Sequence, residues 1–150
     1  MIRPSDVSVT RPANVTAYTA GDVMGHATGN ALEFFTEANG RIRGAVFIDS
    51  TAEVTKPEFD LFLFDAEPTV ADDNAAFAPT DAQMKRLVGV ISFLAANFKV
   101  GGANGATILE GRDLPYFAPD RKLYGVMVAR NAYVPVSEEE FTLRLMVEPN

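Results

Sequence analysis

The residues that could carry out chemistry are few and lie far apart in the sequence. The single histidine, His26, stands between Gly25 and Ala27, with no second imidazole for a metal site and no serine elbow beside it. We therefore predict a turn or surface position for His26. The chain has no cysteine, which excludes disulfides, thiolate metal ligands and a cysteine nucleophile. No catalytic residue, metal site or cofactor is predicted.

Oxygen-bearing side chains gather at Asp72, Asp73 and Asn74, where they could help to bind a hard cation. The run lacks the alternating spacing, the central glycine and the distal glutamate of a calcium-binding loop. We therefore expect these side chains to stabilise a turn. Residues 101–105, Gly-Gly-Ala-Asn-Gly, are not followed by Gly-Lys-Ser/Thr, so they predict a turn and not a phosphate-binding loop. Residues 138–140, three glutamates, predict a solvated turn.

Length and charge limit the possible classes of protein. A chain of 150 residues is about one domain long and can bury a substantial core. The net charge of −7 disfavours binding to nucleic acid or to an anionic membrane. No apolar run approaches the roughly 18 residues of a membrane span, and the first residues lack the apolar core of a signal peptide. We expect neither a nucleic-acid nor a membrane partner.

Two segments predict strands that are apolar on both faces. In residues 59–64 only Asp60 interrupts the apolar run, and residues 87–94 form the second such strand. If the first strand turns Phe59, Leu61 and Leu63 towards the core, Phe62 and Phe64 need a cover of their own. The sequence therefore predicts that these two phenylalanines face either a second sheet or another subunit.

A hairpin is predicted from residue 31 to residue 49, because Asn39-Gly40 supplies the positive φ angles of a tight turn. Strict alternation in its second strand places Ile42, Val46 and Ile48 on one face. The other face then carries Arg41, Arg43, Ala45 and Phe47. Taken alone, this face could be a plain solvent-facing strand, but its mixture of arginine and aromatic residues is also typical of protein interfaces. The predicted interface residues are these: Arg41, Arg43, Phe47, Phe62 and Phe64.

The pattern as a whole predicts an all-β fold. About eight short strands alternate with turn signals, and Thr80 with Gln83 forms a capping signal for one short helix near residues 80–87. We predict an antiparallel β-sandwich, jelly-roll-like or barrel-like. Residues 1–12 are expected to form an extended N-terminal arm or edge strand, and residues 13–150 a single β domain. The connection of residues 65–79 is long enough to suggest an interaction segment.

Several of these segments resemble small structural proteins of tailed bacteriophages and prophages. The resemblance covers nearly the whole chain. In the middle of the chain it is carried by a hydrophobic strand leading into residues 65–69, by the loop 73–77 and by the strand entry Leu87-Val88-Gly89. Elsewhere it is carried by residues 11–12 with 16–23, by residues 122–128, and by the Tyr-x-Pro-x-Ser pattern of residues 133–137 before Phe141-Thr142-Leu143. These are packing and turn patterns, and none of them identifies a reaction.

The resemblance implies a virion structural protein, specifically a capsid decoration or cement protein that stabilises the phage head. Such a protein would be non-enzymatic, would associate with itself, with a trimer favoured, and would bind the major capsid protein. It would reside on the capsid surface, and in the host cytoplasm during assembly. The alternative is a ligand- or carbohydrate-binding β-sandwich module of a phage tail or another assembly, which would normally expose aromatic residues, whereas this chain has no tryptophan and only four tyrosines. A hydrolase on a β scaffold would need paired carboxylates brought together by folding.

Overall fold

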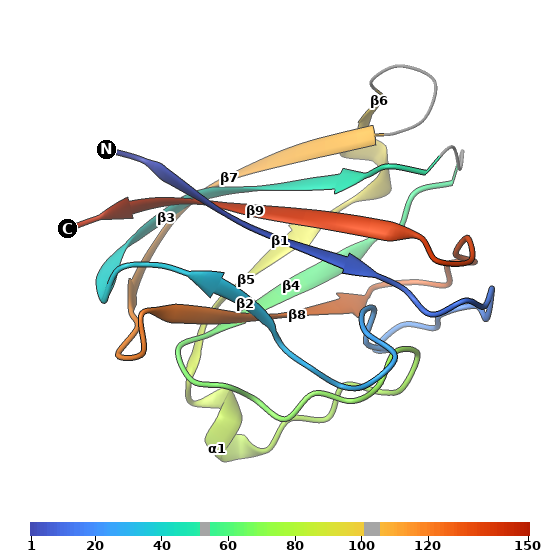
Figure 1. Cartoon of the computed structure of the whole chain (residues 1–150), viewed down its shortest axis with the longest axis horizontal. Coiled ribbons are helices and arrows are strands. Elements are labelled where there is room, and N and C mark those ends of the chain that lie inside the picture. Colours follow the sequence, from blue (N-terminus) through green and yellow to red (C-terminus); the bar gives the residue numbers. More distant parts are fainter. Residues whose placement is uncertain (52–54, 101–105) are drawn as a thin grey trace.

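The protein folds as two packed antiparallel sheets, shown in Figure 1 as a computed structural model that describes residues 1–51, 55–100 and 106–150. The turn predicted at residues 101–105 lies outside the described residues. In the five-stranded sheet the order is β1 (Arg3–Thr10), β9 (Glu140–Pro149), β3 (Asn39–Asp49), β7 (Ala106–Phe117) and β6 (Lys99–Val100). In the four-stranded sheet it is β2 (Leu32–Phe35), β8 (Lys122–Ala129), β4 (Phe59–Phe64) and β5 (Leu87–Phe93). The predicted all-β sandwich is confirmed.

Helical structure in the described residues is confined to α1 (Asp81–Met84) and the 3-10 turn η1 (Ala95–Asn97). Thr80 caps α1 as its sequence predicts: its hydroxyl accepts from the Gln83 amide, and the Gln83 side chain accepts from the Thr80 amide. The helix is only one turn long because β5 begins at Leu87. Neither helix has the length or the apolar composition needed to span a membrane.

The core between the sheets is built around a group of phenylalanine rings. Phe47 of β3 contacts Phe59 of β4 edge to face at 4.7 Å, and Phe59 stacks on Phe93 of β5 at 4.8 Å. Phe141 of β9 completes the group at 5.5 Å from Phe47. Such aromatic contacts between the two inner faces hold the layers together, mainly through the apolar area they bury.

Strand β3 corrects the predicted division of its faces. A β-bulge shifts its register between Ile42 and Gly44 against both neighbouring strands. Beyond the bulge the alternation is inverted, so that Ala45 and Phe47 join Ile42 in the core, and Val46 takes the outer face. The prediction of Phe47 as an interface residue is therefore wrong: its side chain is fully buried inside the sandwich.

The outer face of the four-stranded sheet is covered by the chain itself. Phe64 is fully buried there, and Phe62 is half-buried. Both rings contact Phe77, at 6.3 and 5.4 Å, and Val70 and Met84 pack on the same cluster. The connection between β4 and β5 thus forms a third layer, visible beneath the sandwich in Figure 1. The prediction is therefore corrected for Phe64, which is covered by this connection and by neither a second sheet nor another subunit. Phe62 is covered only in part, and its contact with another subunit stays a prediction.

The N-terminal segment forms an edge strand. Within the described ranges, strand β1 pairs only with β9, along its full length from Arg3 to Thr10. It buries the side chain of Val9 and half-buries Val7, while Asp6 forms a two-point ion pair with Arg144 at 2.7 and 2.9 Å. At its end the chain turns inward at Arg11, which leads into the loops at one end of the sandwich.

Candidate functional site

The predicted interface residues do not form one surface. Arg41 and Arg43 lie on the outer face of the five-stranded sheet, where the guanidinium of each contacts Asp113 at 3.0 Å. Arg43 also contacts Glu148 of the neighbouring strand at 2.5 Å. Arg41, and to a lesser extent Arg43, lowers the pKa of the exposed Asp113 carboxyl. Both arginines are thus neutralised by their own sheet.

Phe62 and Phe64 belong to the opposite side of the molecule, on the outer face of the four-stranded sheet. Phe47 lies between the two sheets and is reached from neither side. The sandwich therefore separates the arginines from the phenylalanines by its own thickness. These residues cannot contribute to a single contact surface.

Asp73 occupies a turn, as predicted, but it also has a buried ionic role that the sequence does not reveal. Its carboxylate contacts the Arg11 guanidinium at 3.3 Å and accepts hydrogen bonds from the Tyr18 hydroxyl at 2.5 Å and the Gly25 amide at 2.9 Å. The Arg11 Nε donates to the same Tyr18 hydroxyl. A buried charge pair is tolerated only when its polar atoms find partners in this way.

The neighbours of Asp73 match their predicted turn roles. Asn74 adopts a left-handed backbone conformation with φ of 66°, and its side-chain amide donates to the carbonyls of Thr16 and Ala17 at 3.1 Å. His26 is half-buried, and its backbone carbonyl accepts from the Asp73 amide at 3.1 Å. The histidine thus acts through its backbone, in a loop contact.

A second buried ionic group adjoins the first. Asp49, at the end of β3, contacts Lys56 at 3.4 Å and accepts from the Thr51 hydroxyl at 2.8 Å. Glu139 lies beside it and accepts from the Tyr133 hydroxyl at 2.9 and 3.0 Å, and from the Val136 amide at 3.3 Å. Burial, followed by the charge of Asp49, raises the pKa of the Glu139 carboxyl.

We refer to these five residues together as the charged cluster: Arg11, Asp49, Lys56, Asp73 and Glu139. Arg11 joins its two halves, because its side chain contacts Asp73 while its backbone amide donates to the Glu139 carbonyl at 3.0 Å. The cluster was not predicted from the sequence. One usable signal was Asp49, a charge that ends an apolar strand. The prediction of a solvated turn at residues 138–140 is wrong for Glu139, which is buried, and nothing in the sequence distinguishes this glutamate from the other two.

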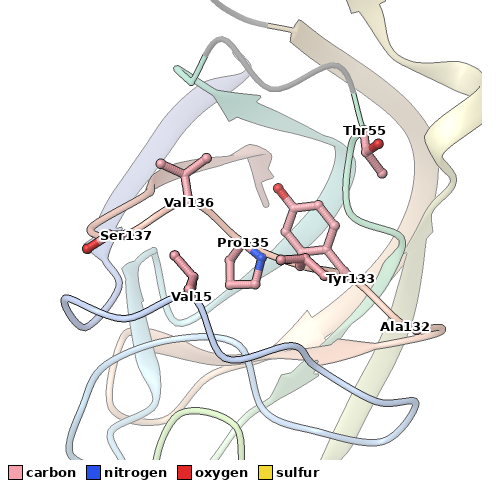
Figure 2. Close-up of a pocket in the computed structure, with 8 residues that line it drawn as sticks. Val15, Thr55, Ala132, Tyr133, Pro135, Val136 and Ser137 are labelled. Atoms are coloured by element: carbon pink, nitrogen blue, oxygen red, sulfur yellow. The ribbon is translucent and has the colours of Figure 1, made fainter.

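A hollow of about 640 Å³ opens beside the charged cluster. Figure 2 shows the residues that line it. Its lining is mainly apolar and consists of these residues: Val15, Thr55, Ala132, Tyr133, Val134, Pro135, Val136 and Ser137. Val15 and Val134 are both more than half exposed, whereas Tyr133 is buried and stacks on Tyr18 with ring centroids 6.5 Å apart. The hollow thus offers aliphatic contacts and no exposed aromatic ring for a sugar to stack on.

The acidic side chains of the cluster are not placed for work on a substrate. Asp49 and Glu139 are 0% and 1% exposed, so a molecule in the hollow would not reach either carboxyl without a movement of the loops. The described part of the chain contains no group of three or more acidic or histidine side chains placed to hold a metal ion. The geometry is that of a buried ionic cluster that holds the surrounding loops in place.

Comparison with known proteins gives no further guidance. Neither protein-family models nor curated protein sequences match this chain.

Proposed function

We propose that this chain is a non-enzymatic structural protein of a virion, a capsid decoration or cement protein that stabilises the phage head. The observation that carries the proposal is the position of its exposed apolar side chains. Phe35 and Phe117 are 68% and 61% exposed, and Val15 and Val134 are 60% and 62% exposed. Large apolar side chains that stay exposed in this way can serve as contact points with a protein partner.

These two groups lie at opposite ends of the sandwich. Phe35 ends β2 and Phe117 ends β7, at the end of the molecule where Figure 1 shows the turns from β2 to β3 and from β7 to β8. Val15 and Val134 border the hollow, in the loops that follow β1 and β8 at the other end. A rigid block with a contact point at each end suits a protein that bridges neighbouring subunits.

The remaining surface supports a role that depends on shape and not on a charged ligand. The arginines of the outer sheet face are paired with Asp113, Glu148 and Asp6 of the same sheet. The net charge of −7 agrees with a protein partner and not with DNA inside a head. We also propose self-association, with a trimer favoured, through these apolar ends, because Phe64 is covered within the chain and Phe62 is covered in part.

The test is co-sedimentation of the purified protein with empty heads assembled from the major capsid protein of the same phage genome. We expect saturable binding in a fixed ratio to the capsid subunit. Phe117→Ala and Val134→Ser should each weaken it about tenfold or more, as expected for contact residues that lose more than about 1.4 kcal/mol. Val90→Ser, on β5 away from both ends, is the control and should bind normally.

Two results would contradict the proposal. Heads that sediment without the protein at high micromolar concentration would exclude the capsid role. A wild-type protein that sediments as a monomer over the same concentration range, without heads, would exclude self-association in solution.

A further inference from the structure

The charged cluster holds an unbalanced set of charges. Two cations, Arg11 and Lys56, face three carboxyl groups, and all five side chains are buried. Asp73 is paired with Arg11 at 3.3 Å, and Asp49 with Lys56 at 3.4 Å. Glu139 is left without an ion-pair partner among the described residues. A buried carboxylate in that position is destabilised unless it takes up a proton.

Several groups face Glu139 among the residues that the structure describes. The Tyr133 hydroxyl and the Val136 amide come from its own loop, and Asp49 and the Thr51 hydroxyl come from the end of β3 and the residues after it. Lys56 lies behind Asp49, and Arg11 links Glu139 to Tyr18 and Asp73. The donors that reach the Glu139 carboxyl are neutral. The nearest charge that acts against its ionisation is Asp49, and both carboxyls contact the same Thr51 hydroxyl, at 3.5 and 2.8 Å.

The bonds made by Glu139 fix the wall of the hollow. Tyr133 and Val136, which bond to its carboxyl, both line the hollow, as Figure 2 shows. The Val136 carbonyl also accepts from the Arg11 guanidinium at 3.0 Å, so the cluster holds this wall from two sides. Anything that drives the Glu139 side chain towards water must pull on residues 132–137.

We propose that Glu139 is a proton-controlled latch on the wall of the hollow: the latch is closed while the carboxyl is protonated and released when it ionises beside Asp49. In the closed state a neutral carboxyl accepts from Tyr133 and Val136 without repelling Asp49. In the released state the carboxylate draws in water, and residues 132–137 open more often. Access to the hollow is therefore greater at neutral and alkaline pH than at mildly acidic pH.

The direction in which pH acts on the closed latch follows from the direction of the pKa shift of Glu139. Burial and Asp49 raise the pKa of Glu139 in the folded protein above the ordinary value of about 4.3 that it has in the unfolded chain. The folded state therefore binds this proton more tightly. The stabilisation is complete below about pH 4.3 and is lost as the pH rises through the raised pKa of the folded state.

Amide hydrogen exchange of residues 132–137 tests the latch, with rates corrected to protection factors. In the wild type we expect protection at least about twofold higher at pH 5 than at pH 8, because the proton that holds the latch closed is lost over this interval. Glu139→Gln, neutral at every pH, should abolish this dependence. Glu140→Gln is the matched control: it removes the adjacent, exposed carboxylate, and it should keep the wild-type dependence.

The proposal is wrong if the wild type shows the same protection at both pH values, or if Glu139→Gln retains the wild-type dependence. A carboxyl ¹³C titration of glutamate-labelled wild-type protein decides the matter even if the variant does not fold. The Glu139 signal should titrate at a higher pH than that of Glu140, and a midpoint at or below about 4.3 overturns the latch. Neither measurement involves a capsid, so the result is independent of the proposed function.

Discussion

Replacing Phe64 by alanine tests whether the chain covers its own second apolar face. Phe64 is 0% exposed, lies on the outer face of the four-stranded sheet, and is covered by the third layer that includes Phe77. A fully buried Phe→Ala change costs about 3 to 5 kcal/mol. We expect a value near the lower limit, about 3 kcal/mol, because a loop layer can relax into the cavity more easily than a sheet can.

The assay is thermal unfolding followed by circular dichroism. For a chain of about this length each kcal/mol lowers Tm by about 2 to 4 °C, so Phe64→Ala should lower it by about 6 to 12 °C. Phe117→Ala is the control of the same residue type: its side chain is 61% exposed, and its loss should cost about 0.5 kcal/mol or less. The difference in Tm between the two variants measures how much the contacts of Phe64 with the third layer stabilise the protein.

Sedimentation of the same variants distinguishes an internal cover from a subunit contact. If the third layer covers the face, Phe64→Ala is less stable and its oligomeric state is unchanged, and Phe62→Asp behaves in the same way. An internal cover is refuted if Phe64→Ala unfolds at the same temperature as Phe117→Ala. It is equally refuted if either change at Phe62 or Phe64 converts a wild-type oligomer into a stable monomer, because the face would then belong to a subunit contact.

Two further predictions concern ionic contacts. Asp73→Ala should lower the free energy of unfolding in urea by about 3 to 5 kcal/mol, because it leaves the buried Arg11 charge without its partner. A decrease below about 1 kcal/mol would show that water reaches this site. At the surface, Arg144 lowers the pKa of Asp6, so the stability from this pair is present above about pH 3.9 and is lost as the pH falls through the lowered value. Arg144→Gln should therefore show a smaller fall in Tm between about pH 4 and pH 2, and an unchanged fall would contradict the assignment.

Local patterns in the sequence were sufficient to predict the class of fold and several of its parts. In β9 the apolar residues Phe141, Leu143, Leu145 and Val147 face the core, as their alternation predicts, because an uninterrupted strand turns successive side chains to opposite faces. The capping box at Thr80 also needs only residues three positions apart. Such features depend on neighbours in the chain, and the sequence contains them directly.

The β3 bulge could not be predicted in this way. Its position is set by the pairing of Ile42 and Gly44 with β7 and β9, two strands that lie far along the chain. A shift of one residue in the register turns every side chain beyond it to the opposite face of the sheet. Phe47 was assigned to the surface for this reason alone, although its apolar character agrees with the buried position it occupies.

The third layer and the charged cluster were decided by tertiary structure alone. Arg11 and Asp73 are 62 positions apart, and no local pattern marks either as the partner of the other. The sequence does show that Phe62 and Phe64 need a cover, but it does not show which segment supplies it. Burial depends on how distant segments meet, and a charge can be buried only where folding provides its partners. Local patterns therefore specify an all-β sandwich with alternating faces, whereas the buried charges and the hollow beside them exist only where folding brings the loops at one end of that sandwich together.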